Sequence, residues 1–201
     1  GWCILHPSRS PRFRCAPLHP MTPLIVVTHI EKTSGTSFVK EVVIPNLPEG
    51  SVVECAGVRH NLAALRDEPR AIAGHTPFGI HRFTRRPCRY VTFLRDPVDR
   101  AISHYHFVRG AKIGTYEHPW CAHANAVGVV EFFRTTPLAN RQTRFLAGLA
   151  GDALARRISS RVLERWLLDA ACAHLERDYV CVGFQERYEE SVALAQRLFG
   201  W

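Results

Sequence analysis

The sequence predicts an α/β fold with a mostly parallel central sheet flanked by helices. Short runs of β-branched and other apolar residues alternate along the chain with longer segments whose apolar residues repeat at helical spacing. The first run, Leu24–Val27, is apolar throughout, as expected for a strand buried on both faces of a sheet. No internal repeat or low-complexity tract interrupts the alternation. Strands separated by helices favour parallel pairing, which gives the predicted class.

In the first half of the chain, the elements follow one another with clear boundaries. A polar stretch at 31–35 follows the first strand, and the next segment predicts a helix over 36–44 that Pro45 ends. Apolar runs and a helical pattern then predict a strand at 51–54, a helix at 61–67, and strands at 71–73 and 90–94.

The helix after the strand at 90–94 carries the clearest start signals. Asp96 is suited to cap it, Pro97 suits its first position, and the acidic Asp99 lies in its first turn. An apolar stripe at helical spacing is expected to face the core and consists of Val98, Ala101, Ile102, Tyr105 and Val108.

The second half adds three helical patterns, a last strand and a last helix, at 127–134, 140–149, 153–175, 179–182 and 186–199. Residues 1–20 are rich in proline and arginine, contain no acidic residue and lack the apolar core of a secretory signal. We expect them to form a poorly ordered basic leader before a single domain at 21–201. Because the chain stops just after the last predicted helix, a C-terminally truncated domain is left open.

Composition indicates an ordinary soluble globular protein with an excess of arginine. The formal net charge is +8, and three of the 26 basic residues are lysines, so 23 are arginines. Guanidinium groups fit phosphate and sulfate oxygens, which suggests a polyanionic partner, but a merely solvated basic surface explains the charge equally well. The seven scattered cysteines form no disulfide framework and favour a reducing compartment. We expect Cys55, Cys172 and Cys181 to be buried.

Two loops that follow strands have the composition of anion sites. The first contains Lys32, Gly35 and the hydroxyl residues Thr33, Ser34, Thr36 and Ser37. Glycine lets the backbone approach a ligand, and the start of the next helix offers free N–H groups. The lysine precedes the glycine, so this is not a Walker A loop. In the second loop, Arg95 leaves the strand at 90–94, and Ser103 lies about two turns into the following helix. A polar turn or a structural Arg–Asp turn is the plainer explanation for each loop alone.

Together the two loops resemble those of PAPS-dependent sulfotransferases. His29–Phe38 resembles the family's 5′-phosphosulfate loop, and Thr92–Arg100 with Ser103 resembles its 3′-phosphate motif. The sequence is most similar to carbohydrate O-sulfotransferases of the heparan sulfate 2-O/uronyl type and their bacterial homologues. Segments at 140–148 and 182–191 also resemble the family, so the resemblance runs from about residue 24 to the end. It implies a P-loop-like sulfotransferase fold.

The resemblance also implies a role for each matching residue. Lys32 contacts the transferred group and stabilises charge that develops on the leaving phosphate. Gly35, Thr36 and Ser37 hold the 5′-phosphate, and Thr33 and Ser34 are further cofactor-binding residues. Arg95 and Ser103 hold the 3′-phosphate, which distinguishes PAPS and its product 3′,5′-ADP from ATP and AMP. The family usually has proline where this chain has Glu31, and a carboxylate there repels the phosphosulfate unless it points away or pairs with an arginine.

Transfer to a hydroxyl needs a base, and we expect His75 to be that base. It follows the predicted strand at 71–73 and therefore lies at the same sheet edge as the anion loops. A Gly-His at this point also resembles the family's catalytic segment. His81 is the reserve candidate, and a histidine that merely packs in a loop remains an alternative. The arginines after it suggest an acceptor groove or a solvated loop; they are Arg82, Arg85, Arg86 and Arg89.

The leading hypothesis is therefore a metal-independent enzyme that transfers sulfuryl from PAPS to a hydroxyl acceptor, with a carbohydrate favoured. His104 and His106 do not share a helix face, and Cys121 with His123 lacks a second ligand pair, so no metal site is expected. The alternatives are a P-loop-like kinase and a non-enzymatic polyanion-binding module, and nucleic-acid binding ranks last. No apolar run reaches the length of a membrane span. We expect a cytoplasmic location, or the Golgi lumen for an animal family member without its anchor.

Overall fold

The structure is a computed structural model that describes residues 22–201, apart from 56, 111, 114–115 and 158–159. The expected leader at 1–20 lies outside the described residues, as do Cys3, Cys15 and the side chain of Cys55.

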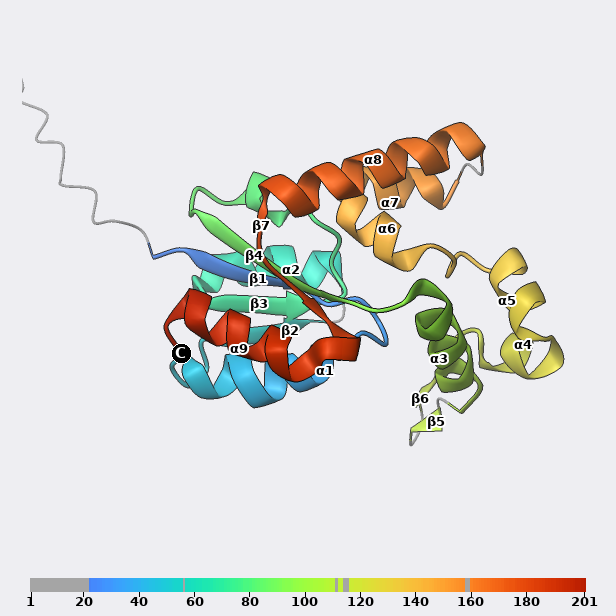
Figure 1. Cartoon of the computed structure of the whole chain (residues 1–201), viewed down its shortest axis with the longest axis horizontal. Helices are drawn as coiled ribbons and strands as arrows, with labels where there is room; N and C mark the ends of the chain where they lie inside the picture. The colour runs from blue at the N-terminus through green and yellow to red at the C-terminus, as the bar shows by residue number, and fades with distance from the viewer. Residues whose placement is uncertain (1–21, 56, 111, 114–115, 158–159) are drawn as a thin grey trace, which may run out of the picture.

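The centre of the molecule is a five-stranded, wholly parallel sheet with the order β2-β3-β1-β4-β7. Its strands are β1 (Leu24–Thr28), β2 (Val52–Cys55), β3 (Ala71–Gly74), β4 (Cys88–Leu94) and β7 (Tyr179–Phe184). Flanking helices cover both faces (Figure 1). The predicted α/β class with a mostly parallel sheet is confirmed.

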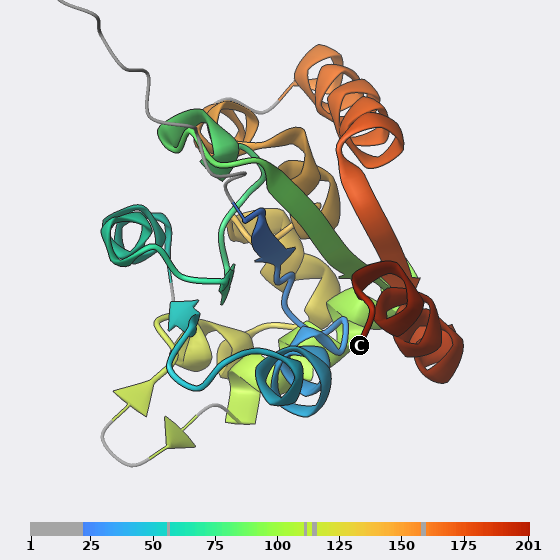
Figure 2. The same cartoon turned by 90° about the vertical axis from the view of Figure 1, so that its left-hand side faces the viewer.

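Alternating side chains of β1 build two separate cores. Ile25 and Val27 pack on one face against the helical segment after β1 and against α9 (Tyr188–Phe199). Leu24 and Val26 pack on the other face, which is covered by α2 (Val58–Ala64), α6 (Arg141–Ala147) and α8 (Arg161–Arg177). Figure 2 shows the sheet edge-on between these layers. Because both faces are buried, β1 is apolar at every position, as its sequence predicted.

After the loop that follows β1, residues 35–46 are helical throughout but change their winding. The segment starts as α1 (Gly35–Ser37), widens into a π-helical stretch at Phe38–Val43 and tightens into a 3-10 turn at Ile44–Asn46. Pro45 lies in this last turn, close to the predicted end. Further 3-10 turns occupy Leu65–Asp67, Ile80–Phe83 and Gln185–Arg187.

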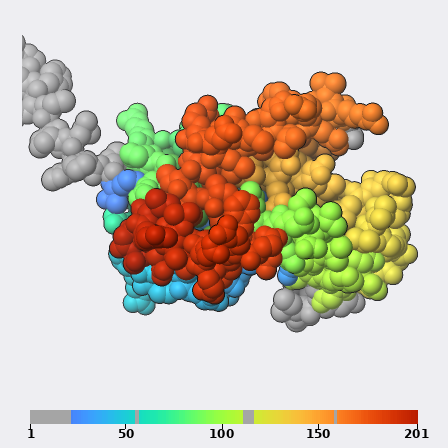
Figure 3. Space-filling model, viewed as in Figure 1, coloured from blue at the N-terminus to red at the C-terminus, as the bar shows by residue number. Residues whose placement is uncertain are grey.

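A small helical lobe lies beyond the carboxyl edge of the sheet. It consists of α3 (Pro97–Gly110), α4 (Cys121–Ala126) and α5 (Val129–Thr135), which share a core that includes Tyr105 and Phe132. An antiparallel pair, β5 (Lys112–Ile113) and β6 (Tyr116–Glu117), follows α3. In the space-filling view, α9 in red and α3 in green lie next to each other on this side of the molecule (Figure 3). The sequence did not predict α4, β5 or β6.

Three sequence predictions are wrong in detail. The predicted helix at 153–175 is two helices, α7 (Leu149–Ala155) and α8, because Ser160 starts a new helix by accepting a hydrogen bond from the Leu163 N–H. The predicted stripe of α3 is only half buried, since Val98 and Ile102 are 63% and 43% exposed. Cys172 is exposed on α8, whereas Cys181 is buried as expected.

Helix α3 buries polar residues where an apolar stripe was expected. Arg100 and His104 are 3% and 2% exposed, and Tyr105 and Val108 are buried beside them. The helix packs beside the polar loops at the sheet edge and not flat on the sheet, so the side that it buries is partly polar. This placement brings α3 into the candidate site.

Candidate active site

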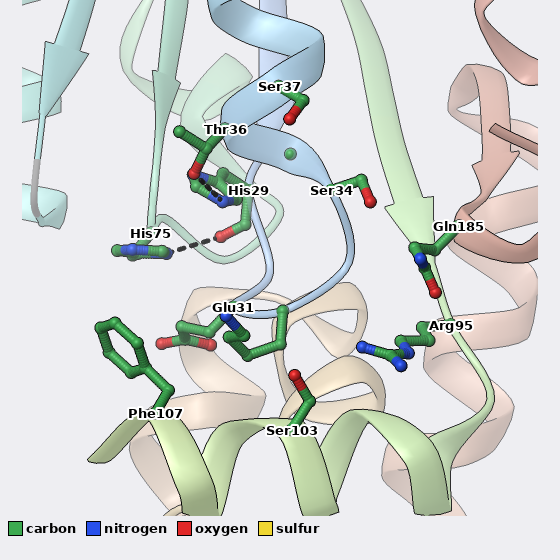
Figure 4. A pocket seen from close by; sticks show the side chains of 12 residues that line it. His29, Glu31, Ser34, Thr36, Ser37, His75, Arg95, Ser103, Phe107 and Gln185 are labelled. Carbon is green, nitrogen blue, oxygen red and sulfur yellow. Dashed lines mark hydrogen bonds between the residues drawn. The ribbon is translucent and has the colours of Figure 1, made fainter. Parts of the chain in front are cut away.

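A cavity of about 350 Å³ opens where β1, β3, β4 and β7 end. Such an edge is where open parallel sheets place their ligands. The loop after β1 forms one wall, and α3 forms the opposite one (Figure 4). His29, Thr36 and His75 lie on one side of the cavity, and Arg95, Ser103 and Gln185 lie on the other.

The loop after β1 carries two non-glycine residues in the left-handed region, Lys32 (φ 68°) and Ser34 (φ 66°). This conformation costs L-residues free energy and reverses the chain sharply. The reversal leads directly into α1, where the Phe38 N–H donates to the Ser34 carbonyl. Three hydroxyl side chains, those of Ser34, Thr36 and Ser37, line the cavity as a result.

Gly35 is required by the ring beneath it. A Cβ atom at this position would lie 2.3 Å from Cδ2 of His29, which real side chains never approach. The absence of a side chain therefore lets the loop close onto His29 and keeps the start of α1 at the cavity wall. His29 Nε2 lies 3.5 Å from the Thr36 hydroxyl.

The ammonium of Lys32 is held toward α3. Its Nζ atom lies 5.0 Å from the centre of the Phe107 ring, a cation–π contact. Phe107 lies one turn after Ser103 on α3, and both side chains line the cavity. The ring thus places one positive charge between the hydroxyl-rich loop and α3.

A second positive charge comes from Arg95, directly after β4. Its Nε atom is buried and has no hydrogen-bond partner among the described residues. Its backbone is fixed by Gln142, whose side chain accepts from the Arg95 N–H and donates to the Arg95 carbonyl, each at 2.9 Å. A guanidinium with a free buried donor, on the same side of the cavity as the hydroxyl of Ser103, is suited to an oxyanion.

Two histidine rings lie in tilted contact at the end of the cavity near β3. Nδ1 of His75 lies 2.8 Å from the carbonyl oxygen of His29, and the ring centres are 4.5 Å apart. Because a carbonyl only accepts, Nδ1 of His75 carries the hydrogen, and in the neutral ring Nε2 is left as the proton acceptor. Burial, together with the nearby His75, lowers the pKa of His29 to about 4 against the opposing effect of Glu31, so His29 is neutral at pH 7.

Glu31 is the acidic side chain among the described residues that line this cavity, and it is neutralised. Arg141 donates to it twice, from Nη2 at 2.5 Å and from Nε at 3.3 Å. Burial alone raises the pKa of Glu31, but the hydrogen bonds and charge of Arg141 outweigh this effect and lower the pKa to about 2. The sequence analysis expected the Glu31 carboxylate to repel an anion unless it pointed away or paired with an arginine. In the structure it is paired with Arg141.

Size does not distinguish this cavity from its neighbours. A larger cavity of about 550 Å³ lies between the start of α6 and α8, and none of its lining residues is shared with the first. It is lined in part by Leu163, Leu167 and Leu168 and lies away from the strand ends. The smaller cavity is the candidate site because the convergent cations and hydroxyls lie there.

Comparisons with known proteins bear on this site. Residues 21–143 match a protein family described as "Sulfotransferase domain", which is well over half of the chain and includes both anion loops. The chain belongs to the sulfotransferase family. A search of curated protein sequences finds no match.

Among solved structures, eleven chains are similar to this sulfotransferase-family chain. One is described as "Crystal structure of mouse sulfotransferase SULT7A1 complexed with PAP", with 16% sequence identity and a TM-score of 0.47. The match covers 89% of the present chain and 59% of the mouse chain. The chain thus spans less than two thirds of the length of that relative.

The structure brings together nearly all of the residues that the sequence indicated for this family's site. Eight of them line the one cavity: Lys32, Ser34, Gly35, Thr36, Ser37, His75, Arg95 and Ser103. Thr33 does not, because it is buried and its hydroxyl donates to the Ile30 carbonyl at 2.9 Å. Its side chain stabilises the loop from behind and is turned away from any ligand.

The arginines after His81 do not form an acceptor groove at this site. Arg86 donates to the carbonyls of Thr22 and Pro69, and Arg89 donates to the carbonyl of Leu198. These contacts lie toward the opposite end of β4 from Arg95. His81 lies in the turn before β4, with its Nδ1 2.9 Å from the Tyr90 hydroxyl, and it is not part of the cavity lining.

Sequence reasoning missed Phe107, Gln185, Arg141 and Gln142. Two of them had a usable signal: Phe107 lies four residues after Ser103 on one helix face, and Gln185 directly follows a strand end. The other two lie in the segment at 140–148 that resembles the family, but they are more than 40 residues from the loops that they hold, and the sequence does not show what they contact.

Within the described residues, no group of three or more His, Cys, Asp or Glu side chains is arranged to hold a metal ion. In the same part of the chain, no helix is long and apolar enough to cross a membrane.

Proposed function

We propose that this sulfotransferase-family chain transfers the sulfuryl group of PAPS to a hydroxyl acceptor. The observation that carries the proposal is the convergence of Lys32 and of the Arg95–Ser103 pair on one cavity of about 350 Å³. The cavity fits a doubly phosphorylated nucleotide because its donors fall into two groups, one at each loop. The unpartnered Nε of Arg95 is the kind of buried donor that a phosphate oxygen satisfies.

Each group of donors has its own task. The hydroxyls of Ser34, Thr36 and Ser37 would hold the 5′-phosphate, and Arg95 with Ser103 would hold the 3′-phosphate. PAPS supplies an activated sulfuryl group on a phosphate leaving group. Lys32, whose ammonium lies against the Phe107 ring, would stabilise the negative charge that develops on this leaving group.

His75 is the proposed general base. Its Nδ1 is engaged with the His29 carbonyl, so Nε2 of the neutral ring is free to take the proton of an acceptor hydroxyl. The neutral His29 beside it adds no positive charge that would weaken this base. We keep a carbohydrate as the proposed acceptor, supported by the resemblance of the two loops to carbohydrate O-sulfotransferases.

Calorimetric titration tests the nucleotide assignment. We expect 3′,5′-ADP to bind more tightly than 5′-AMP, because only the former has a phosphate for Arg95 and Ser103. Lys32→Ala and Arg95→Ala should each weaken 3′,5′-ADP by about 10- to 100-fold, the usual effect of losing a charge-assisted hydrogen bond. The exposed residues Lys40 and Arg165 provide the controls Lys40→Ala and Arg165→Ala, which should leave binding unchanged. Equal affinities for the two nucleotides would contradict the 3′-phosphate assignment.

A P-loop-like kinase is the second candidate, because the sheet and the loop after its first strand are arranged similarly. It is less well supported, since Glu31, the acidic side chain at the described cavity, is bound to Arg141 and is not available to a magnesium ion. Hydrolysis of ATP in the presence of Mg²⁺, with no preference for 3′-phosphorylated nucleotides, would favour the kinase.

A further inference from the structure

Two adjacent residues at the start of α6 hold the two anion loops, one each. Arg141 donates from Nη2 and Nε to the carboxylate of Glu31, the residue directly before Lys32. Gln142 forms reciprocal 2.9 Å hydrogen bonds with the backbone N–H and carbonyl of Arg95. Because the two side chains leave neighbouring positions of one helix, the loops are tied to a common support.

We propose that Arg141 and Gln142 are positioning residues that set the spacing of the two anion loops, and that this spacing selects a nucleotide phosphorylated at both its 5′ and 3′ positions. The inference rests on the proposed function, because it takes the cavity as the nucleotide site. We call the two residues the loop clamp.

The sheet alone does not fix the loops relative to each other. The pairing of β1 with β4 ends at Thr28 and Thr92, where the Thr92 hydroxyl donates to the Thr28 carbonyl. Beyond that point, the hydrogen bonds that connect the described loop residues to a shared element are those to α6. The clamp therefore links the two loops by hydrogen bonds where the pairing of their strands has ended.

Arg141 also maintains an unfavourable backbone conformation. Lys32 has a φ of 68°, which a non-glycine residue keeps only when neighbouring contacts hold it there. Its neighbour Glu31 is fixed by two hydrogen bonds to an arginine that is itself only 7% exposed. The ion pair therefore anchors the Lys32 reversal from one residue away.

Arg141 is itself held by neighbouring side chains of α6 and α7. Its guanidinium lies 4.2 Å from the centre of the Phe145 ring, and its Nη1 lies 4.0 Å from Asp152. Asp152 is buried and is also held by Arg144 at 2.9 Å and Arg156 at 3.0 Å. Glu31, Arg141 and Asp152 thus form a row of alternating charges that ties the Lys32 loop to α6 and α7.

The chemistry of each clamp residue matches its task. A guanidinium satisfies a carboxylate with two donors, which a lysine at this position cannot reproduce. The amide of Gln142 presents one acceptor and one donor, which are the two groups needed to satisfy both polar atoms of one peptide backbone.

Three nucleotides separate the contributions of the two loops: 3′,5′-ADP, 5′-AMP and 3′-AMP. We expect Arg141→Met to weaken 3′,5′-ADP and 5′-AMP by about tenfold while 3′-AMP binds as before, since only the Lys32 loop is released. Gln142→Leu should weaken 3′,5′-ADP and 3′-AMP by about tenfold and leave 5′-AMP unchanged. The affinities of Arg141→Lys for 3′,5′-ADP and 5′-AMP should lie between those of Arg141→Met and those of the wild type. Thr143→Val, the next residue on α6, is the matched control, because Thr143 lines the larger cavity between α6 and α8, which neither clamp residue lines.

Steady-state kinetics distinguish positioning from a merely structural role, because a merely structural role would not separate the effects of the two variants into kcat and KM. Arg141→Met should lower kcat, because it displaces Lys32 from the developing charge, whereas Gln142→Leu should mainly raise KM for PAPS, since the 3′-phosphate is held equally before and during transfer. Thermal melting of each variant shows whether it is folded; if Arg141→Met does not fold, the ligand pattern of Gln142→Leu and Arg141→Lys carries the test.

The possible outcomes distinguish a failure of the clamp proposal from a failure of the proposed function on which it rests. A wild-type protein that binds none of the three nucleotides would overturn both proposals. A wild-type protein that binds 3′,5′-ADP, with clamp variants that leave all three affinities unchanged or reduce them by equal factors, would overturn the clamp and leave the nucleotide site in place.

Discussion

His75 shows how one backbone contact determines the chemistry of a side chain. Its bond to the His29 carbonyl fixes the hydrogen on Nδ1, and the position at the end of β3 places the ring at the cavity. The contact is made by the chain of β1, so two neighbouring strands jointly orient the ring. The reserve candidate His81 has no such placement.

We predict that His75→Ala binds 3′,5′-ADP normally but loses most of its transferase activity. General-base catalysis typically contributes about 10²- to 10⁴-fold, so kcat should fall within that range. The measurement is sulfate transfer to a hydroxyl acceptor beside a nucleotide titration of the same preparation. His60→Ala, at an exposed histidine on α2, is the control. Transfer at the full rate by His75→Ala would refute the base assignment.

At this scale, the sequence indicated residues that the structure brings together wherever the position of a residue is set locally. Lys32, Arg95 and Ser103 were found because strand ends and helix starts position such residues in a regular way. The sequence grouped Thr33 with the nucleotide-binding residues, but its hydroxyl donates to the Ile30 carbonyl and does not line the cavity, because alternate positions of a tight loop face opposite sides and only coordinates show which. The partners Arg141 and Gln142 depend on how α6 packs against the sheet, which no short segment encodes.

Among the elements, α3 connects the sheet edge to the helical lobe, and its start is well defined. The Asp96 carboxylate accepts from the N–H groups of Val98 and Asp99, at 2.9 and 3.0 Å. The Asp96 N–H in turn donates to Glu186, which ties the cap to the turn before α9. The predicted cap is therefore present, and it fixes the helix that carries Ser103 and Phe107.

We predict that Asp96→Ala destabilises the protein by about 1 kcal/mol, the typical cost of removing an N-cap side chain. Because α3 also carries Ser103, the affinity for 3′,5′-ADP should fall modestly as well. Urea unfolding and nucleotide titration measure the two effects. Asp99→Ala removes a carboxylate of the same helix turn without removing the cap, and the prediction fails if both variants lose equal stability.

Helices and strands were predictable from the sequence where a strand is buried on both faces or where capping residues mark the end of a helix. Strands such as β1 and β4 are buried on both faces, so their apolar runs are unambiguous. The division between α7 and α8 was missed because the apolar pattern continues across it. The face of α3 was misjudged because its neighbours include polar loops, so that Arg100 and His104 are inside.

For the whole molecule, two histidines link stability to pH, the half-buried His29 and the buried His104. Burial lowers the pKa of both His29 and His104 from 6.5 to about 4. The unfolded chain therefore binds protons between pH 6.5 and 4 while the folded protein does not, so stability is complete above pH 6.5 and is lost as the pH falls toward 4. Glu31, whose pKa is lowered from 4.5 to about 2, adds a further loss below pH 4.5.

We predict that His104→Phe flattens this pH dependence. His104 is 2% exposed and its Nδ1 has no hydrogen-bond partner in the described structure, so a ring without nitrogens fits the site chemically. The lowering of the His104 pKa from 6.5 to about 4 corresponds to about 3 kcal/mol in the free energy of unfolding. Between pH 7 and pH 4, the loss of stability should therefore be about 3 kcal/mol smaller in the variant than in the wild type. Urea unfolding across this range provides the measurement. Parallel pH profiles for the two proteins would contradict the role of His104.

The strand order has a consequence for how the chain assembles. Neighbouring strands in β2-β3-β1-β4-β7 are all parallel, so no pair of them is joined by a tight hairpin. Such long-range pairing forms slowly, because large loops must close before any contact stabilises them. During synthesis, the anion loop after β1 emerges early but has no clamp until α6 has been made. We therefore expect the capacity to bind nucleotide to be acquired late and in a single step, which makes it a sensitive marker of completed folding.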